Sequence, residues 1–333
     1  MSVHSDSSMQ SSIRLQRYVA ILSLLLFLIK IFAWYKTHSI SILTDALESI
    51  VNVIAGFFGL YSLVLSAKPR DSEHPYGHGK VEFISAAIEG TMIVLAGLTI
   101  IWESVQQLMH PEALHRVSDG MLLLASTALI NAGLGWWAGR QGKKKSSLVL
   151  MASGKHLMAD AHTTGGILVG LALMQMTGWS WLDPVIALGL AGWIIWTGYQ
   201  IVRQSIAGIM DEADHALIDR LMDYMDQHRQ PNWIDLHNLR VIKYGTKLHI
   251  DAHLTLPWFF NMHEAHREID ALSELVRSHF GQSVELFIHT DGCLNFSCSI
   301  CDLQHCEKRQ TPFVKRVPWT RELVSTDEKH RAI

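Results

Sequence analysis

Long apolar stretches separated by short polar segments fill the first two thirds of the chain. Six of them approach or exceed the roughly 20 residues that an α-helix needs to cross a bilayer. They occupy residues 18–35, 40–65, 84–108, 121–138, 148–176 and 181–202. This pattern predicts an α-helical membrane domain with six transmembrane helices.

Beyond residue 202 the apolar positions fall into shorter patterns that are typical of a soluble domain. Helical spacing covers residues 215–228 and 263–280, and strand-like segments cover 236–244, 247–256 and 284–289. The order helix, strand, strand, helix, strand predicts a small α+β domain.

The two patterns divide the chain into four parts. We expect a polar N-terminal tail at 1–13, the membrane domain at 14–208, the α+β domain at 209–291 and a C-terminal tail at 292–333. The N-terminal residues lack the pattern of a cleavable signal peptide. The chain has 28 Lys and Arg against 31 Asp and Glu, so its charge gives no reason to expect a nucleic-acid partner.

Basic residues flank the apolar stretches unevenly. One set of segments holds Arg14, Arg17, Lys68, Arg70, Lys80, Arg140, Lys143, Lys144, Lys145 and Arg203, whereas the opposite loops hold only Lys36 and Arg116. Because cytoplasmic loops of membrane proteins carry the excess of Lys and Arg, we expect both termini to be cytoplasmic. The chain is thus expected to be a multi-pass protein of the cell inner membrane.

A histidine and a carboxylate lie one helical turn apart within the fifth apolar stretch. His156 and Asp160 share a helix face, and their nitrogen and oxygen atoms suit zinc, iron(II), manganese or cobalt. The alternative is a satisfied pair in a helical core. Ionisable residues inside a membrane are costly and usually functional, which favours a metal site.

The second apolar stretch presents three oxygen-bearing side chains on one face, those of Asp45, Glu48 and Asn52. Two carboxylates close together in an apolar medium need a cation, a proton or a basic partner. For Asn52 alone, a hydrogen bond that holds two packed helices together is an equally good explanation. In the neighbouring stretches, we expect Glu89 to support the site and Lys30 to reach the membrane surface.

The segment between the second and third stretches combines a carboxylate with two imidazoles. Asp71, His74 and His78 lie among Pro75, Gly77 and Gly79, which break helices and let a loop fold around one ion. A histidine-rich surface loop is alternatively only polar filler. However, the run HPYGHGKVE resembles a recurrent signature of the cation diffusion facilitator family, whose members are proton-coupled metal efflux transporters.

The resemblance extends from the first apolar stretch to about Asp291. It implies a transport site with His156 and Asp160 on the fifth span. On the second span it places Glu48 and Asn52 at the ligand positions and leaves Asp45 one turn away as an alternative ligand. Asn52 departs from the family's carboxylate, so the metal preference of zinc-transporting relatives does not carry over to this chain.

The resemblance also implies a metallochaperone-like cytoplasmic domain that forms a homodimer around zinc. Its ligand positions correspond to His237, His253, His266, His289 and Asp291 in this sequence. The competing explanation is that histidines are simply abundant, with 19 in the chain. The family further implies an ion pair between Lys80 and Asp211 where its two domains meet.

These features predict a transporter that exports Zn²⁺, or Fe²⁺, Mn²⁺ or Co²⁺, from the cytoplasm in exchange for protons. The metal would be both substrate and structural ion. The segment from His263 to His266 is not the H-E-x-x-H motif of a metalloprotease, which argues against an enzyme. The alternative function is a membrane-anchored metal sensor that does not transport.

All four cysteines of the chain lie in the C-terminal tail, at Cys293, Cys298, Cys301 and Cys306. The central C-x-x-C pair is common in zinc sites, and four thiolates suit one zinc ion. Disulfides are rare in the reducing cytoplasm. The tail is therefore predicted to bind metal, with free thiols as the alternative.

Overall fold

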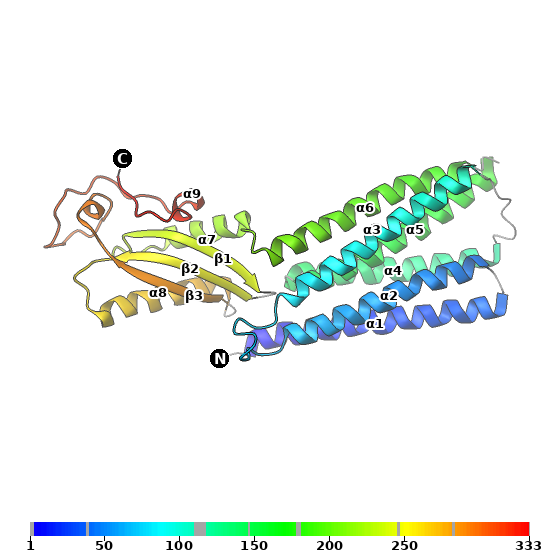
Figure 1. Ribbon diagram of the computed structural model, residues 1–333, viewed down its shortest axis with the longest axis horizontal. Coiled ribbons are helices and arrows are strands. Elements are labelled where there is room, and N and C mark those ends of the chain that lie inside the picture. The colour runs from blue at the N-terminus through cyan, green and yellow to red at the C-terminus, as the bar shows by residue number, and fades with distance from the viewer. Residues whose placement is uncertain are drawn as a thin grey trace. The chain divides into compact units, whose positions relative to one another are not determined.

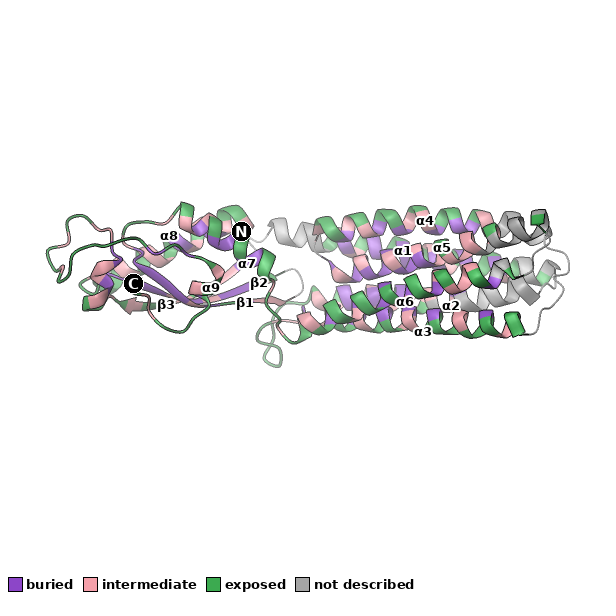
Figure 2. Ribbon diagram, turned by 90° about the horizontal axis from the view of Figure 1, so that it is seen from above, coloured by how far each residue is buried: buried purple, intermediate pink, exposed green. Residues whose placement is uncertain are grey.

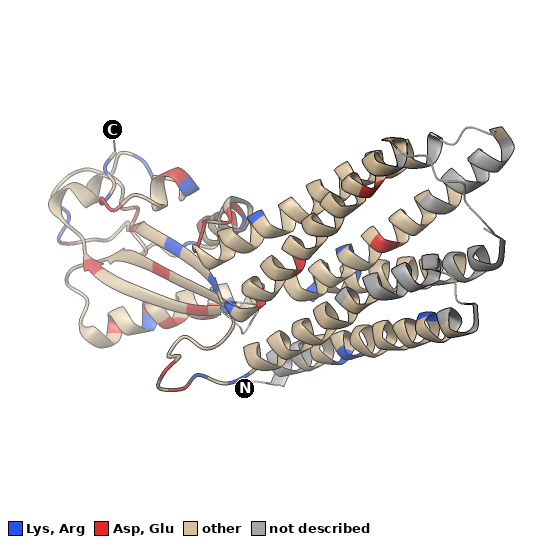
Figure 3. Ribbon diagram, turned by 45° about the vertical axis from the view of Figure 1, so that its right-hand side comes forward, with Lys and Arg blue, Asp and Glu red and all other residues tan. Residues whose placement is uncertain are grey.

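The computed structural model describes residues 3–37, 40–109, 118–145, 147–177, 181–244, 247–281 and 284–332. The chain forms two compact units, a helical one at Asp6–Met210 and a mixed one at Asp211–Ile333 (Figure 1). Figure 3 shows how differently the two are charged: Lys, Arg, Asp and Glu are sparse along the helices of the first unit and frequent in the second.

Six long helices build the first unit, and each covers one of the predicted apolar stretches. They are α1 (Val3–Thr37), α2 (Ile40–Ser66), α3 (Val81–Met109), α4 (Ser118–Lys145), α5 (Leu148–Thr177) and α6 (Leu182–Ile209). Helix α5 packs against α2, α3, α4 and α6, so it occupies the middle of the bundle.

Three segments of this bundle are long and apolar enough to cross a membrane by themselves: Gln10–Phe32, Val81–Gln106 and Pro184–Ile209. This finding concerns only the residues that the structure describes. Helix α5 carries Lys155, His156 and Asp160 along its length, and α4 ends in three lysines, which lowers their hydropathy. The number of six spans stays a prediction.

The outer surface of the bundle is apolar, and its interior holds polar side chains beside apolar ones such as Ile93 and Ile194. Large apolar side chains such as Phe32, Trp102 and Leu129 are 63%, 67% and 75% exposed, while Gln16 and Glu89 are buried. Figure 2 shows the buried residues along the inward faces of the helices. Exposed apolar side chains suit a surface that faces lipid. The buried polar groups must then find hydrogen-bond partners within the protein.

Glycines bring α4 and α5 into close contact. A Cβ atom added to Gly154 would lie 2.5 Å from the backbone nitrogen of Gly139, and one on Gly142 would lie 2.7 Å from the nitrogen of Met151. Such small-residue contacts are a common way to pack helices in membranes. They fix the position of α5, the helix that carries His156 and Asp160.

The second unit has the predicted order of elements. They are α7 (His215–Gln227), β1 (Asp235–Tyr244), β2 (Lys247–Leu256), α8 (Met262–Phe280), β3 (Val284–Gly292), the 3-10 helix η1 (Asn295–Ser299) and α9 (Arg321–Val324). The sheet has the order β1-β2-β3, with β1 antiparallel and β3 parallel to β2. A capping box between Asn261 and Glu264 begins α8.

One face of this sheet and the helices share a core. Ile250 and Leu254 of β2 pack with Leu221 of α7 and with Leu272 of α8. Since side chains alternate along a strand, Asp251 and His253 point to the opposite face, whereas Ala252 shares the core face. The helices and strands predicted from the spacing of apolar residues are therefore confirmed in this domain. The sheet face that carries His253 is not part of the shared core and can bind ligands.

The C-terminal segment packs onto this domain. Trp319 and Val324 belong to its main core, and Ile300, Cys301 and Val317 form a second small core with Ile234. The Arg229 guanidinium donates hydrogen bonds to the backbone oxygens of Trp233 (2.6 Å) and Val317 (2.8 Å) and lies over the Trp319 ring. These contacts give the segment a fixed path across the domain.

Candidate functional site

Two helices bring polar side chains together inside the bundle. His156 Nε2 lies 4.0 Å from Asp160 Oδ1 along α5, and the Asn52 amide of α2 donates a 2.5 Å hydrogen bond to Asp160 Oδ2. The His156 side chain is 8% exposed and that of Asp160 is 31% exposed. The structure thus joins the two apolar stretches that the sequence analysis singled out, although their spacing in sequence exceeds 100 residues.

The side chains of Asp45 and Glu48 lie outside the described residues, although both positions belong to α2. Ser49, next to Glu48, accepts a 2.8 Å hydrogen bond from the Lys30 ammonium of α1. Lys30 is only 5% exposed, so the expectation that it reaches the membrane surface is wrong. A hydrogen-bond acceptor inside the bundle keeps this charge away from lipid.

A chain of hydrogen bonds connects Glu89 to the helix that carries His156. The Ser153 hydroxyl, one turn before His156, donates to Glu89 Oε2 at 3.3 Å and accepts from Gln16 Nε2 at 3.1 Å. Glu89 is 4% exposed. Glu89 therefore contacts α5 through Ser153, and its support of the metal site stays a prediction.

Glu82 is a second buried carboxylate in α3 that sequence reasoning missed. Its two oxygens accept hydrogen bonds from Ser66 (2.7 Å) and Ser147 (3.4 Å), and the residue is 1% exposed. Glu82 belongs to the run HPYGHGKVE, and a glutamate at the very start of an apolar stretch was the signal that could have identified it. It connects the ends of α2, α3 and α5.

The loop between α2 and α3 gathers the three predicted ligands. His74 Nδ1 lies 3.2 Å from Asp71 Oδ1, and His78 Nε2 lies 3.4 Å from Asp71 Oδ2. Gly77 has φ +90°, a backbone conformation that glycine adopts readily. A backbone hydrogen bond from His74 holds the pKa of Asp71 below its usual value, so the carboxylate stays ionised. One donor atom from each residue lies within 4.8 Å of the others.

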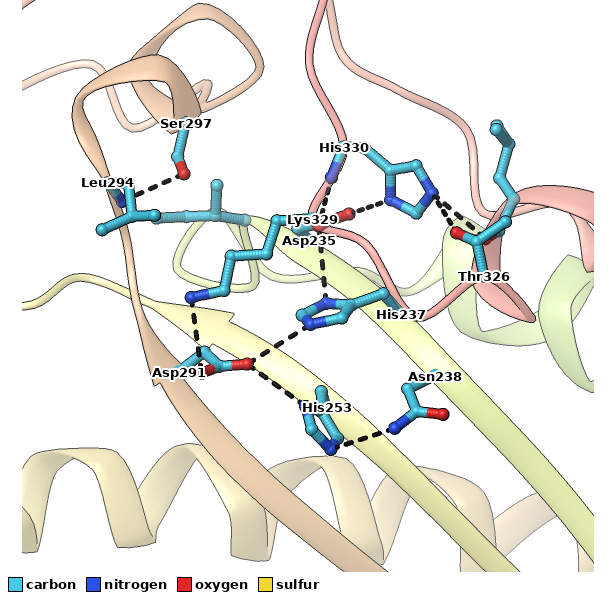
Figure 4. Close-up of polar contacts among 12 residues, drawn as sticks. Asp235, His237, Asn238, His253, Asp291, Leu294, Ser297, Thr326, Lys329 and His330 are labelled. Carbon is cyan, nitrogen blue, oxygen red and sulfur yellow. Dashed lines mark hydrogen bonds and ion pairs between the residues drawn. The ribbon is translucent and has the colours of Figure 1, made fainter.

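The sheet of the second unit builds another cluster through strand register. His237 of β1 is paired with His253 of β2, and His253 is paired with His289 of β3. Asp291 follows two residues later in β3. Its Oδ2 atom lies 3.3 Å from His237 Nε2 and 3.4 Å from His253 Nδ1, as Figure 4 shows.

Two of the five predicted cytoplasmic ligands are placed differently from these three. His289 Nε2 lies 3.9 Å from the other oxygen of Asp291 and is at the edge of the group. His266 does not join it, because α8 carries it on an exposed face, where its imidazole lies 3.7 Å from Asp270. The compact ligand group therefore consists of His237, His253 and Asp291.

A buried carboxylate stands behind His237. Asp235 Oδ2 lies 3.5 Å from His237 Nδ1, the ring nitrogen opposite to the one that faces Asp291. Carboxylates in this position orient metal-binding histidines and raise their basicity. Burial lowers the pKa of His237, which keeps its imidazole neutral and able to bind a metal ion. The i, i+2 spacing from His237 on one strand was the missed signal for Asp235.

The four cysteine side chains line one cavity of about 30 Å³ beside β3, together with Ile234 and Trp258. All four are free thiols. The Arg309 guanidinium donates to the carbonyls of Cys298 (2.9 Å) and Cys301 (3.0 Å), and the Gln310 N–H donates to Cys298 Sγ. Among the described residues, only the loop and sheet clusters already hold three ligand atoms within 4.8 Å.

Comparison with protein families identifies the class of protein that carries these sites. Residues 17–210 match the cation efflux transmembrane domain, and residues 213–293 match the cytoplasmic domain of cation efflux proteins. The chain belongs to the cation efflux family. The resemblance to the cation diffusion facilitators is thereby confirmed, and the protein is a transporter rather than an enzyme.

Individual proteins similar to this cation efflux protein carry the names of transporters or cation-efflux pumps. It is 34% identical to an uncharacterised transporter of Synechocystis sp. over 253 residues, which cover 74% of this chain and 80% of that protein. It is 30% identical to the cation-efflux pump FieF of Pectobacterium carotovorum over 281 residues, 81% and 89% of the two chains. For FieF of Salmonella newport the identity is 28% over 273 residues, 80% and 88%.

The family match also assigns the two units. The helical unit is a membrane domain, and the unit with the small sheet is a C-terminal cytoplasmic domain. The residues from 294 onward lie outside both matched segments. Cys298, Cys301 and Cys306 and the last helix of this cation efflux protein therefore lie beyond the matched core, and Cys293 is its last matched residue.

Proposed function

We propose that this cation efflux protein exports a divalent transition-metal ion, Zn²⁺ or Fe²⁺, Mn²⁺ or Co²⁺, from the cytoplasm in exchange for protons. The observation that carries the proposal is the meeting of Asn52 with His156 and Asp160 inside the bundle. The membrane domain would have six spans with both termini in the cytoplasm, in the inner membrane. The working form would be a homodimer.

The proposed exchange depends on competition at His156. Its imidazole binds either a proton or a metal ion at the same nitrogen, so protonation on the far side releases the metal. Asp160 supplies one negative charge, and Glu48 would supply a second, which together neutralise a divalent ion. Burial of His156 limits access to the site and strengthens these charge interactions.

In this proposal the metal preference depends on Asn52, which stands where the family has a carboxylate. In the structure its amide nitrogen faces Asp160, so the amide must rotate to present its oxygen to a metal ion. A neutral amide is a weaker ligand than a carboxylate. Asp45, one turn before Glu48 on α2, is the alternative ligand.

The remaining clusters are proposed accessory metal sites. The loop group of Asp71, His74 and His78 would take an ion at the bundle's end. The sheet group would take ions that stabilise the cytoplasmic dimer, with His289 as an outer ligand. His266, on an exposed face of α8, would bind an ion only apart from this group. The cysteine segment would hold one further zinc-like ion, because its four thiols share one cavity.

A metal sensor without transport remains the second candidate, and the preformed group of His237, His253 and Asp291 is the observation that favours it. Uptake into proteoliposomes separates the two functions, since a sensor binds metal without accumulating it. We expect accumulation of at least one of the four metals that increases with a proton gradient across the membrane. Binding without accumulation under any gradient would establish the sensor.

The same assay on Asn52→Asp tests the site. A carboxylate in place of the amide should change the order of preference among the four metals, because it adds a negative ligand. The exposed His162 on α5 offers a control, and His162→Ala should keep the wild-type preference. If Asn52→Asp changes neither rate nor preference, the assignment of the second-span ligands is wrong.

A further inference from the structure

The last residues of the chain lie on the sheet cluster. Lys329 and His330 come from the segment beyond residue 293, outside both matched family domains. In Figure 4 the Lys329 side chain points to Asp291, and the His330 ring points to Asp235, the carboxylate behind His237. A part of the chain that the family core lacks therefore reaches the candidate metal ligands.

Lys329 places a positive charge on a ligand carboxylate. Its ammonium lies 3.3 Å from Asp291 Oδ1 and donates a 3.2 Å hydrogen bond to the backbone oxygen of Gly292. The other oxygen of Asp291 faces the imidazoles of His237 and His253. The side chains of Lys329 and Asp291 are only 20% and 21% exposed, so water screens the pair weakly.

His330 and its neighbours hold this lysine in place. The His330 backbone N–H donates to Asp235 Oδ2 at 3.0 Å, and its Nδ1 lies 2.7 Å from Asp235 Oδ1. Three residues earlier than Lys329, the backbone oxygen of Thr326 accepts a 2.6 Å hydrogen bond from the Asn238 N–H. Contacts on both sides of Lys329 thus fix the segment to β1.

We propose that Lys329 is a built-in cation that competes with the metal ion for Asp291 and thereby sets the affinity of the cytoplasmic site. The inference rests on the proposed metal binding by His237, His253 and Asp291. With the metal absent, the lysine neutralises Asp291. A divalent ion on the same carboxylate repels the ammonium, so binding must move Lys329 away while His330 keeps its hold on Asp235.

An ordinary structural ion pair would behave differently. If Lys329 only stabilises the fold around the site, its removal loosens Asp291 and weakens metal binding or leaves it unchanged. If Lys329 competes with the metal, its removal strengthens binding. The sign of the change in affinity separates the two.

The test uses the full-length protein in detergent, with Asp160→Ala to weaken the membrane site, and titrates Zn²⁺ by calorimetry or against a chromophoric chelator. We expect Lys329→Met to tighten binding by about tenfold, since it removes one near charge of the metal's sign. Lys329→Arg should remain close to wild type. The exposed Lys315 of the same segment provides the matched control, and Lys315→Met should not change the affinity.

A second measurement follows the segment itself. The Lys329 amine should react faster with an acylating reagent when Zn²⁺ is added to the wild type, while the hydrogen exchange of the His330 amide stays unchanged, and the amine should not respond to Zn²⁺ in His237→Ala. Unchanged or weaker Zn²⁺ binding in Lys329→Met, while His237→Ala loses one bound ion, would overturn the competition and leave the metal site standing. If His237→Ala loses no ion, the metal site itself fails.

Discussion

Two of the candidate metal sites, the one on the sheet and the one in the bundle, differ in how far each is assembled before an ion arrives. In the cytoplasmic domain, the register of neighbouring strands and one short segment of β3 already place three ligand atoms within 4.8 Å. In the bundle, His156 and Asp160 are 4.0 Å apart, and the Asn52 amide occupies one oxygen of Asp160. A site that must release its ion in each cycle gains from such a competing internal contact. In the sheet site the competing Lys329 contacts Oδ1 of Asp291 and leaves Oδ2 facing the two imidazoles.

The largest expected effect is in the bundle. Asp160→Ala should reduce metal uptake to background, because it removes one of two charges that neutralise the ion in a low-dielectric setting. Proteoliposome uptake measures the loss, and helical content and elution volume show that the protein remains folded. His162→Ala on the same helix should transport normally. Uptake by Asp160→Ala at the wild-type rate would remove this site from the transport path.

A smaller effect is expected for Lys80 and Asp211, which the family resemblance implies as an ion pair. The single reversals Lys80→Asp and Asp211→Lys should impair uptake, and the double reversal should recover part of it. An exposed ion pair stabilises by only about 0–1 kcal/mol, so unfolding temperatures should change little.

The control for the charge reversals lies in the same loop. Lys68 is exposed, and Lys68→Asp should leave transport unaltered. The pairing is refuted if the double reversal transports no better than either single variant.

The cysteine segment should affect metal content without affecting transport. Cys298→Ser/Cys301→Ser should lower the zinc content of the purified protein by one ion, because two of four thiols are lost from one cavity. Metal analysis after dialysis gives the count, and His237→Ala shows separately what the sheet site contributes. An unchanged count would mean that the thiols hold no stable ion, and a loss of transport would mean that the segment does more than bind metal.

The smallest effect concerns pH. The hydrogen bond to Asp235 raises the pKa of His330 above its usual 6.5, although burial opposes this. Burial acts to raise the pKa of Asp235, but the hydrogen bonds from His330 outweigh it and hold the value below 3.8. Both members of the pair are therefore charged at pH 6. The stability that protonated His330 gives to the attachment of the C-terminal segment is lost as the pH rises through its raised pKa.

Hydrogen exchange of residues 326–332, corrected for the intrinsic rate, should accordingly increase from about pH 6 to about pH 8.5. His330→Gln should remove this dependence. A segment that is equally protected at both values would show that the charge of His330 does not hold it.

The sequence predicted features that repeat at helical or strand spacing. The pair of His156 and Asp160 follows from one helical turn, and the sheet histidines follow from the family resemblance. Contacts between distant segments without a periodic pattern were missed. His330 meets Asp235 across 95 residues, and nothing in the spacing of either residue indicates the other. Lys30 was misjudged for the same reason, because its partner Ser49 is on another helix.

The glycine contacts between α4 and α5 have a consequence for movement. Where a Cβ atom on Gly154 would meet the backbone of Gly139 at 2.5 Å, no flexible side chain lies between the helices to absorb sliding. We therefore expect α4 and α5 to move as one rigid body. Opening of His156 and Asp160 toward either side of the membrane would then come from displacement of α2 and α3 against this pair, and Gly154→Ala would change the rate of that displacement by forcing the two helices apart.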